Sequence, residues 1–425
     1  MRGSSMQSSS SSLTCEGCSQ LDTPRLSTSP SSTTQVCDET IISRTYYAAC
    51  DLFHLDSGST PTDDHSINNP VTVFDEAYHL HARTAHMGIL DPAYKVFTSH
   101  QGLGALLYKL QARTAVVAGD PLCTTEHRTP LLKEFAIFRK EQGLGIAFVG
   151  ASEDFSLYAQ QQGWTTLRFG HERVINPLTN KVLRNQASKR MISQNRMLLD
   201  PKRGGTSIKI YCPSVTGVDA SLEYRLQQLY DDWRQERNHK CGKDLQAFVT
   251  VYDLFSYPAS TLFLYTTDKD GSITGFATLR ALGAQNGFHI DPFIASSTAP
   301  RGITDLLIVT SMQILKHAEI GYLSLGFEPA SDIQEVHGQT KFESWVWKQG
   351  YNRVIKSVPV TGKAAFFNKF YPEDSLSSDL FICVPGRGIP VRGSLALMQF
   401  ANMNVWQLLI HKKGKHKEPQ TTSSS

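Results

Sequence analysis

The segment GFHIDPFI (287–294) carries the residues best suited to acid–base chemistry in this sequence. Asp291 stands at the predicted edge of a strand, two residues after His289. A positioned carboxylate can remove a proton or hold a cationic group, so Asp291 is the first candidate for a catalytic residue. Two alternatives stay open: Asp291 caps a turn before Pro292, and His289 is an ordinary half-buried histidine.

A second carboxylate candidate lies in SLEYRLQQLYDDWRQERNH (221–239), which the apolar spacing predicts to be a long amphipathic helix. Asp232 in its Asp-Asp-Trp triplet could hold a cationic group beside Asp291. The alternative is that Asp232 lies on a solvated, charged helix face.

A strongly basic segment spans residues 181–205, KVLRNQASKRMISQNRMLLDPKRGG. The formal net charge of the whole chain is only +3, so any site for a polyanion must come from local clustering of this kind. Phosphate contacts need clustered cations but carry no base specificity. The alternative is a solvated basic helix face. The cations of the segment are Lys181, Arg184, Lys189, Arg190, Arg196, Lys202 and Arg203.

The loop SSTAPRGITD (296–305) precedes another predicted helix and contains a single glycine, Gly302, after Arg301. A pyrophosphate group at a helix N-terminus needs converging backbone N–H groups, which a glycine-rich loop supplies. One glycine makes a poor cradle, so the sequence argues against coenzyme A as an acyl donor. Arg301 remains a candidate site residue.

The eight cysteines do not form a convincing metal site. Cys15 and Cys18 have the spacing of a ligand pair, but Cys37 and Cys50 do not form a second close pair. No metal ion is therefore expected. The sequence opens without the apolar segment of a secretory signal, so a reducing, cytoplasmic compartment is favoured. No apolar run reaches the roughly 18 residues that a membrane-spanning helix needs.

The elements that must position these residues alternate between strand and helix, with glycines closing the helices. The sequence predicts an α/β (α+β) fold of two lobes with mixed sheets, in which a strand or hairpin is followed by a helix and another strand. The Asp270-Gly271 turn predicts a hairpin within 261–282. The expected strands are 112–121, 145–150, 165–175, 206–213, 287–294 and 322–327, and the expected helices are 129–143, 153–163, 180–198, 221–239 and 304–321.

Four regions follow from this order. Residues 1–65 are rich in Ser, Thr and Pro and predict a disordered extension. Residues 66–200 form the first lobe with a linker helix, and residues 201–411 form the second, catalytic lobe. Residues 412–425 are a basic and polar tail.

Several motifs, in order, resemble the C-terminal catalytic domain of phosphatidylglycerol lysyltransferases and other tRNA-dependent lipid aminoacyltransferases. Each motif alone is weakly specific, and together they cover about residues 90–385. They are VVAGDPL (116–122), LRNQASKR (183–190), DDW (231–233), GSITGFATL (271–279), HIDPFI (289–294), APRGITDLLIV (299–309), LSLGFEP (323–329) and, more weakly, FFNKFYPE (366–373).

The resemblance implies two tandem acetyltransferase-like (GNAT) lobes with a tunnel between them, open to lipid at one mouth and to tRNA at the other. The implied reaction moves an aminoacyl group from charged tRNA to a lipid hydroxyl. Because the ester donor is already activated, no covalent nucleophile and no cofactor are expected. Asp291 would act as base or amino-group anchor, with Asp232, Arg301 and Lys369, the clearest match to the family's basic residues, beside it. The expected tRNA contacts are Arg184, Lys189, Arg190, Arg196, Lys202 and Arg203.

One departure bears on the acceptor. The family places Arg three positions after the aspartate, where this chain has Ile294. Loss of a cation that would pair with phosphate indicates a neutral acceptor such as a sterol. In its domain content and Ser-rich start the chain most resembles free-standing fungal ergosteryl-glycine synthases, which esterify ergosterol with glycine. Phe293, Phe327 and Phe366 would line the lipid site.

The segment VRGSLALMQFANMNVWQLLIH (391–411) predicts a helix with a broad apolar face, followed by four lysines. Such a helix could lie on a membrane or lipid droplet as a peripheral contact. The alternative, which its Asn- and Gln-rich polar face favours, is a C-terminal helix docked on the second lobe.

Three other functions stay open: transfer to phosphatidylglycerol, an acyl-CoA N-acyltransferase of the same fold, and a non-catalytic lipid- or RNA-binding protein. The loop with a single glycine argues against the acyl-CoA N-acyltransferase. The absence of the family's Arg at Ile294 keeps the non-catalytic binding protein open.

Overall fold

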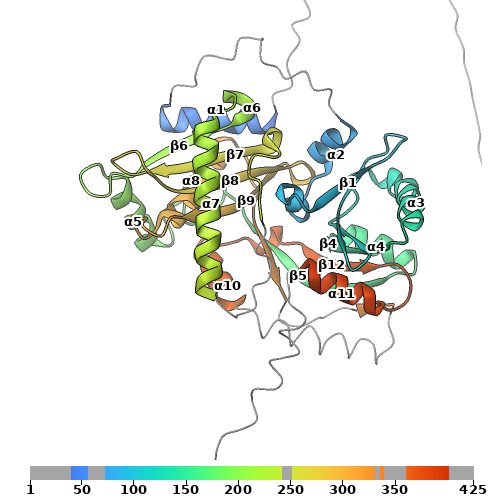
Figure 1. Cartoon of the computed structure of the whole chain (residues 1–425). Coiled ribbons are helices and arrows are strands. Elements are labelled where there is room, and N and C mark those ends of the chain that lie inside the picture. Colours follow the sequence, from blue (N-terminus) through green and yellow to red (C-terminus); the bar gives the residue numbers. More distant parts are fainter. Residues whose placement is uncertain (1–39, 56–71, 242–250, 331–335, 339–359, 402–425) are drawn as a thin grey trace, which may run out of the picture. The chain divides into compact units, whose positions relative to one another are not determined.

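The structure is a computed structural model that describes residues 40–55, 72–241, 251–330, 336–338 and 360–401 (Figure 1). Within these residues, twelve strands form one continuous mixed sheet in the order β1-β2-β3-β4-β12-β5-β10-β9-β8-β7-β6, with β11 paired to β5. The α/β class with a mixed sheet is therefore confirmed. The strands are β1 (Tyr94–Thr98), β2 (Ala105–Gln111), β3 (Thr114–Ala118), β4 (Gly145–Ala151), β5 (Thr165–Ile175), β6 (Ser207–Tyr211), β7 (Thr261–Thr267), β8 (Ile273–Leu282), β9 (Gly287–Ala295), β10 (Leu323–Pro329), β11 (Val336–His337) and β12 (Asp379–Val384).

The same order of elements occurs twice along the chain. In the first half, antiparallel strands β1, β2 and β3 lead through helix α3 (Thr125–Glu141) to β4, which is parallel to β3. In the second half, antiparallel strands β6 to β9 lead through helix α8 (Ile303–His317) to β10, which is parallel to β9. This repetition is the tandem arrangement that the order of predicted elements indicated.

The two halves are joined within the sheet. β5 of the first half pairs with β10 of the second, and β12, which follows both halves in sequence, lies between β4 and β5. The boundary expected at residue 201 placed residues 379–384 in the second lobe, but their hydrogen bonds are to strands of the first. Local periodicity could not reveal this, because partner choice depends on strands more than 200 residues away in sequence.

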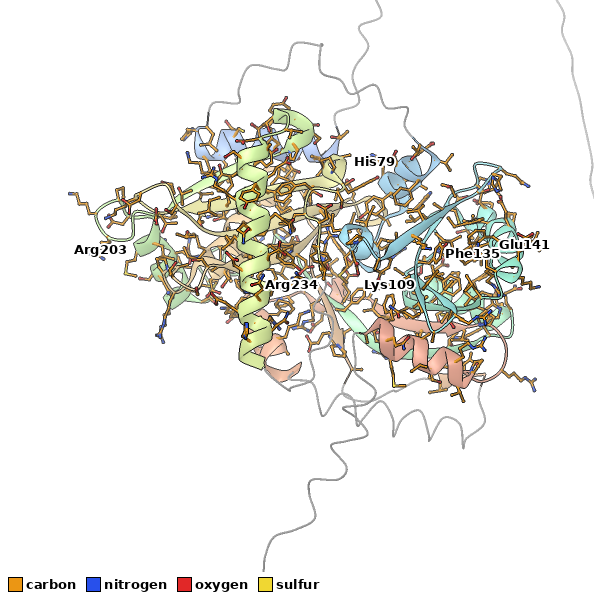
Figure 2. The ribbon with its side chains drawn as sticks, viewed as in Figure 1. His79, Lys109, Phe135, Glu141, Arg203 and Arg234 are labelled. Carbon is orange, nitrogen blue, oxygen red and sulfur yellow. The ribbon has the colours of Figure 1, made fainter. Side chains whose placement is uncertain are left out.

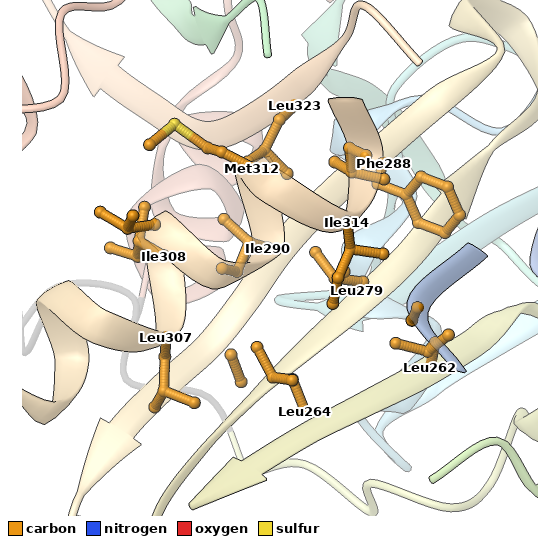
Figure 3. Packing of buried hydrophobic residues seen from close by; sticks show 14 of the residues in the cluster. Leu262, Leu264, Leu279, Phe288, Ile290, Leu307, Ile308, Met312, Ile314 and Leu323 are labelled. Carbon is orange, nitrogen blue, oxygen red and sulfur yellow. The ribbon is translucent and has the colours of Figure 1, made fainter. Parts of the chain in front are cut away.

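The largest core lies between α8 and strands β7 to β10 (Figure 3). Leu307 and Ile314 of α8 and Leu264, Leu279 and Ile290 of the strands are fully buried. Burial of one such side chain contributes about 1.5–3 kcal/mol, so this layer fixes β9 firmly against the helix.

A helix occurs where the sequence predicted disorder. α1 (Ile41–Phe53) begins after Thr40, whose hydroxyl accepts a hydrogen bond from the Ser43 N–H. Ile42 and Tyr46 are buried in the core beneath α8. The expectation of disorder across residues 1–65 is therefore wrong for this part. The Ser- and Thr-rich stretches on either side obscured the 3.6-residue spacing of apolar residues that indicates this short helix. Residues 1–39 and 56–65 lie outside the described residues.

The C-terminal helix α11 (Val391–Phe400) packs on the first half, not on the second as the docked alternative supposed. Ala396 and Leu397 bury their side chains with Val116, Ala147 and Val384. Residues 402–425, with the expected membrane contact and the lysine-rich tail, lie outside the described residues. Among the helices that the structure describes, none combines the length and apolar character needed to cross a membrane.

The remaining helices frame both halves, and α7 runs along one face of the second half in Figure 1. They are the α-helices α2 (Val73–His81), α4 (Glu153–Gln161), α5 (Lys189–Leu199), α6 (Pro213–Thr216), α7 (Ala220–Cys241) and α10 (Val360–Asn368), and the 3-10 helices η2 (Thr84–Leu90), η3 (Pro258–Ser260), η4 (Gly283–Gln285) and η5 (Asp374–Leu376).

Candidate active site

The two parallel strands of the second half separate at the residues that the sequence singled out. β9 and β10 pair at Phe288 with Leu323 and at His289 with Ser324. Beyond that point β9 and β10 share no further pairs, and each has a register shift against its other neighbour, β8 or β5. In the first half, by contrast, β3 and β4 stay paired from Thr114 to Ala118. In the second half, the pairing of these two neighbouring strands therefore stops after two residues, and we call this place the splay.

A bulge in β9 turns Asp291 and Ile294 to the same face of the sheet. The register with β8 shifts between Ala277 and Leu279, so two residues of β9 lie opposite one. Before the bulge Ile290 belongs to the core under α8, and after it Phe293 packs against that core while Ile294 belongs to the cluster under α7. The extra residue thus reverses the alternation, which strand periodicity alone could not show.

Asp291 is half-buried and is held at both its side chain and its backbone. The Tyr252 hydroxyl donates to its carboxylate Oδ2 at 2.9 Å. Its carbonyl oxygen accepts hydrogen bonds from the Thr278 hydroxyl and, at 3.2 Å, from the Arg280 guanidinium. The carboxylate is therefore oriented by groups from β8 and from the loop before β7.

Arg280 is a site residue that the sequence analysis missed. It is 1% exposed, and its guanidinium donates at 2.6 Å to the carbonyl of Met87 as well as to that of Asp291. The guanidinium carbon lies 5.9 Å from the centre of the Tyr252 ring. Because a buried cation is costly, Arg280, as the only charged residue of β8, could have been recognised from the sequence.

His289 lies where the strands part and is 2% exposed. Its Nδ1 is 3.2 Å from the carbonyl oxygen of Ser324. The pKa of His289 is lowered to about 4, first because the ring is buried, while Asp291 opposes this and Arg280 and Lys363 add to it. The imidazole is therefore neutral at physiological pH.

An aromatic stack closes the α7 side of the site. The ring centres of Trp233 and Tyr230 lie 6.1 Å apart, and those of Tyr230 and Tyr252 lie 5.8 Å apart. Burial, followed by the negative charge of Asp291, raises the pKa of both Tyr230 and Tyr252. Both phenols thus stay protonated, which lets Tyr252 donate to Asp291.

A lysine of α10, also missed from sequence, faces the site from the other side. The Lys363 ammonium donates to the Phe327 carbonyl at 3.3 Å and lies 5.3 Å from the centre of the Phe367 ring. Its side chain keeps exposed surface, yet partial removal of the ammonium from water lowers the pKa of Lys363. The carboxylates of Asp291 and Glu328 oppose that shift.

Lys369, the basic residue expected in the site, pairs with an acid on α8. Its ammonium contacts the Asp305 carboxylate and lies 3.9 Å from the centre of the Phe366 ring. Phe366 in turn stacks on Phe293, with ring centres 5.9 Å apart. Lys369 therefore contacts residues on the face of β9 that is directed toward α8, where Phe293 lies. Asp291 lies on the opposite face of β9.

Two of the three phenylalanines expected in a lipid site come together in this stack, Phe293 and Phe366. Phe327 lies elsewhere: an ideal Cβ at Gly150 of β4 would be 3.1 Å from its ring. The ring of Phe327 is thus directed toward the first half of the sheet.

The structure places Asp232 on the exposed face of α7. Its carboxylate accepts a hydrogen bond from Gln228 of the same helix at 2.9 Å. The neighbouring Asp231 is the residue of the pair whose charge acts on Tyr230 and so reaches the aromatic stack. Among the described contacts nothing brings Asp232 to Asp291, because the helix directs it outward.

Arg301 lies beside the basic segment, and none of its described contacts is with Asp291. It is exposed, and its carbonyl accepts a hydrogen bond from the Gln194 side chain of α5 at 2.6 Å. Gln194 is part of a surface hollow of about 540 Å³ along α5. Arg190, Arg196 and Arg203 line the same hollow.

The other expected cations on this surface are exposed as well, namely Arg184, Lys189 and Lys202. Figure 2 shows Arg203 at the end of the second half, near α5, while Arg234 lies on α7. Arg190, Arg196 and Arg203 thus share one hollow on α5 and the loop after it, which we call the basic face of α5.

No group of three or more His, Cys, Asp or Glu side chains suited to a metal ion occurs in the described part of the chain. Cys50 is buried in the inner face of α1. Cys15, Cys18 and Cys37 lie outside the described residues.

Comparison with proteins of known sequence finds two informative relatives. The phosphatidylglycerol lysyltransferase of Bacillus subtilis (strain 168) is 25% identical over 295 residues, which are 68% of this chain and 32% of that protein. The "Lysylphosphatidylglycerol biosynthesis bifunctional protein LysX" of Rhodococcus jostii (strain RHA1) is 22% identical over 208 residues, 49% of this chain and 18% of that protein. The chain thus spans a third or less of the length of these curated relatives.

Two solved structures share the fold. L-PGS from Bacillus licheniformis has a TM-score of 0.57 at 19% identity, covering 80% of this chain and 94% of that one. The C-terminal DUF2156 domain of an Agrobacterium fabrum protein has a TM-score of 0.56 at 20% identity, covering 78% of this chain and 94% of that one.

The sequence family described as "Phosphatidylglycerol lysyltransferase, C-terminal" matches residues 76–377. This match covers well over half of the chain and includes every strand of the sheet except β12, together with the splay at Asp291 and the basic face of α5. The chain therefore belongs to the phosphatidylglycerol lysyltransferase C-terminal family.

Proposed function

We propose that this protein transfers an aminoacyl group from aminoacyl-tRNA to the hydroxyl group of a membrane lipid. The observation that carries the proposal is the oriented Asp291 carboxylate beside the splay, in a chain of this family. The printed names of the relatives, which refer to lysyl transfer and to lysylphosphatidylglycerol, support the same class of reaction.

The chemistry needs positioning and charge more than a covalent nucleophile. An aminoacyl ester is already activated, so the site must hold the acceptor hydroxyl against the ester carbonyl and stabilise the oxyanion that forms. Asp291 supplies the negative charge that a protonated α-amine requires, and the Lys363 ammonium is a cation near the same carboxylate. No cofactor takes part in this scheme, since the charged tRNA is the donor substrate.

The basic face of α5 is the proposed tRNA contact. Arg190, Arg196 and Arg203 share one hollow, and Arg301 lies beside it through the Gln194 contact. Exposed guanidinium groups suit phosphate oxygens, because each can donate two parallel hydrogen bonds. Arg184, Lys189 and Lys202 would extend this contact along the acceptor arm.

We propose a neutral lipid alcohol, such as a sterol, as the acceptor, and glycine as the amino acid. Ile294 is 2% exposed and follows Asp291 on the same face, so a buried apolar side chain stands where the family places a cation. The stacked Phe293 and Phe366 offer apolar surface beside β9. A sterol would be held by burial, worth about 25 cal/mol for each Å² of apolar surface.

Phosphatidylglycerol is the second candidate acceptor. The names of the relatives favour it, and the chain offers cations near β9 in Arg280, Lys363 and Lys369. A buried phosphate must be paired with such a group. Reaction at the membrane surface is proposed for either acceptor.

The proposed class of reaction is tested by lipid mass spectrometry of cells with and without this chain. An aminoacylated lipid that disappears when the chain is removed, and returns with the wild-type gene, supports the proposal and names donor and acceptor together. An unchanged lipid profile in cells that express the protein contradicts it.

The acceptor is tested by competition. Purified protein and charged tRNA are offered vesicles that contain both ergosterol and phosphatidylglycerol. A sterol ester that forms equally well without anionic lipid supports the neutral acceptor, whereas exclusive modification of phosphatidylglycerol overturns it.

A further inference from the structure

The imidazole of His289 has one nitrogen bonded and one free. Nδ1 contacts the Ser324 carbonyl at 3.2 Å, whereas Nε2 is buried without a hydrogen-bond partner among the described residues. Buried polar atoms without partners are rare, and a binding site is one reason to retain one. Nε2 is therefore an atom whose partner is expected to come from a ligand.

The contact with Ser324 fixes which nitrogen carries the proton. A carbonyl oxygen can only accept, so Nδ1 must be the N–H donor in the neutral ring. Nε2 then presents a lone pair and can only accept. This excludes a carbonyl, a phosphate or a carboxylate as its partner and requires a hydroxyl or an N–H group.

The charged groups around the ring keep that lone pair available. The pKa of His289 is about 4 because burial lowers it and Arg280 of β8 and Lys363 of α10 add to that shift, while Asp291 of β9 and the contact with Ser324 oppose it. At neutral pH the acceptor form is thus fully populated. The Asp291 carboxylate would stabilise the imidazolium if a proton arrived.

Glycine at position 326 keeps the backbone clear of the ring, because a side chain there would press against it. Gly326 has φ of 92°, and an ideal Cβ there would lie 3.3 Å from the His289 Cε1 and 4.0 Å from the Lys363 Nζ. The imidazole and the Lys363 ammonium therefore both lie beside Gly326, so a hydroxyl bound to the first would place the reacting ester near the second, where a cation can stabilise a developing oxyanion.

Building on the proposed function, we propose that the His289 Nε2 is the general base that binds the acceptor hydroxyl and takes its proton. As the acceptor oxygen attacks the ester carbonyl carbon, its proton moves to Nε2. When the tetrahedral intermediate collapses, the bond from the carbonyl carbon to the ribose oxygen breaks, and that oxygen takes the proton back from His289. Atoms and charge balance, and the products are the aminoacylated lipid and deacylated tRNA.

This assignment leaves a different task for Asp291. A carboxylate that already accepts from Tyr252 can bind the protonated α-amine of the aminoacyl group and stabilise the imidazolium. The two groups would then act together, the imidazole on the nucleophile and the carboxylate on the donor.

Two substitutions separate the roles of the two ring nitrogens. His289→Asn keeps an N–H donor near the Nδ1 position, so the contact with Ser324 can survive, but it removes Nε2. His289→Gln places an amide near the Nε2 position, which can bind a hydroxyl but cannot take its proton. His317→Asn, at an exposed histidine near the end of α8, is the matched control.

The test measures kcat and KM for transfer from charged tRNA to ergosterol or phosphatidylglycerol vesicles. His289→Asn and His289→Gln should both lower kcat by about 100-fold. This value is at the lower end of the contributions that general bases make, because an imidazole with a lowered pKa is a weak base. KM for tRNA and lipid should change by less than about threefold, as should both constants in the control. A kcat within about threefold of wild type in His289→Asn overturns the proposal, while an inactive wild type speaks against the proposed function itself.

A measurement on the wild-type protein covers the case in which the variants do not fold. In protein labelled with ¹⁵N-histidine, the Nε2 of His289 should give the signal of an unprotonated nitrogen. Added dihexanoyl-phosphatidylglycerol, or ergosterol in cyclodextrin, should shift that signal by donating a hydrogen bond. A signal that neither alcohol moves, with a protein that is active on one of them, overturns the proposal.

Discussion

Asp291 differs from an ordinary surface aspartate because both its side-chain carboxylate and its backbone carbonyl accept hydrogen bonds from neighbouring residues. Thr278 and Arg280 bind its carbonyl and Tyr252 its carboxylate, so its orientation is set before any substrate arrives. A preorganised charge costs no reorganisation during the reaction, which is why such groups contribute strongly to catalysis.

Asp291→Asn should therefore keep the fold and lose most transfer activity. The amide preserves the shape of the side chain and removes the charge. Loss of one charge-assisted contact in such a site is worth about 2–4 kcal/mol, or roughly 100- to 1000-fold in rate. The assay is transfer of labelled amino acid into lipid, with Asp270→Asn in the exposed β7–β8 turn as the control. Near-wild-type turnover of Asp291→Asn would remove Asp291 from the mechanism.

The histidine beside it makes a prediction about stability and pH. The pKa of His289 is about 4 in the folded chain against 6.5 as its ordinary value, so the unfolded state binds a proton first. The contribution of the neutral His289 ring to the free energy of unfolding is complete above about pH 6.5 and is lost as the pH falls toward 4. The total loss is on the order of 3 kcal/mol.

His289→Asn should remove this part of the pH dependence. Urea unfolding at pH 7 and at pH 4.5 should show a smaller loss of unfolding free energy in the variant than in the wild type. Equal losses in the two proteins would mean that the ring is not buried as a neutral group. His86, whose pKa is lowered by burial as well, is present in both proteins and cancels in the comparison.

At the scale of elements, α1 is the part of the fold that sequence composition hid most completely. Tyr46 is 6% exposed in the core under α8, whereas its neighbour Tyr47 is 38% exposed. Tyr46→Ala should lower the free energy of unfolding by about 3 kcal/mol, because it leaves a cavity, and Tyr47→Ala by about 1 kcal/mol or less. Chemical denaturation measures both, and equal effects would show that α1 does not pack as described.

The basic face of α5 makes a prediction about salt. Replacing Arg190, Arg196 and Arg203 by Gln removes the three cations of the shared hollow. tRNA affinity should fall, and the slope of log K against log salt should flatten by somewhat under one unit for each lost phosphate contact.

The matched control for this triple variant removes the same charge elsewhere. Lys140, Lys209 and Lys316 are exposed and lie on α3, β6 and α8. Their replacement by Gln should leave the slope nearly unchanged. If the two triple variants behave alike, the face of α5 is a solvated surface and not a specific contact.

Most elements with a strong period could be predicted from the sequence. β5 is Thr165–Ile175 as expected, and α7 and β9 agree to within two residues. The helix expected at 129–143 begins earlier, because α3 starts at Thr125 and contains Pro130 within it.

The site could be predicted in part. Asp291 was predicted from its place at a strand edge, two residues after His289 and within a motif that resembles the family. Arg280 could have been found as the only charged residue of a buried strand. Tyr252 and Lys363 could not be found, because they come from segments whose place depends on tertiary packing. The exposed position of Asp232 depends on the rotation of α7, which two adjacent acids in a charged helix cannot fix.

At the scale of the whole molecule, the two halves have the same order of strands and helices but differ in how their two parallel strands pair. β12 closes the first half between β4 and β5, and β3 and β4 stay paired, so this half presents a continuous sheet. The second half leaves β9 and β10 parted and gathers His289, Asp291 and Arg280 on one face. This difference is the reason to place the reaction in the second half.

The most direct test of the central claim is a reconstituted transfer reaction. Purified protein, tRNA charged with radiolabelled amino acid and vesicles of ergosterol and phosphatidylglycerol are incubated together, and the lipid extract is counted. The account predicts label in a lipid ester, dependent on intact tRNA and abolished by ribonuclease treatment beforehand. Label that stays with tRNA or is released as free amino acid, with a folded protein and both lipids present, would contradict it.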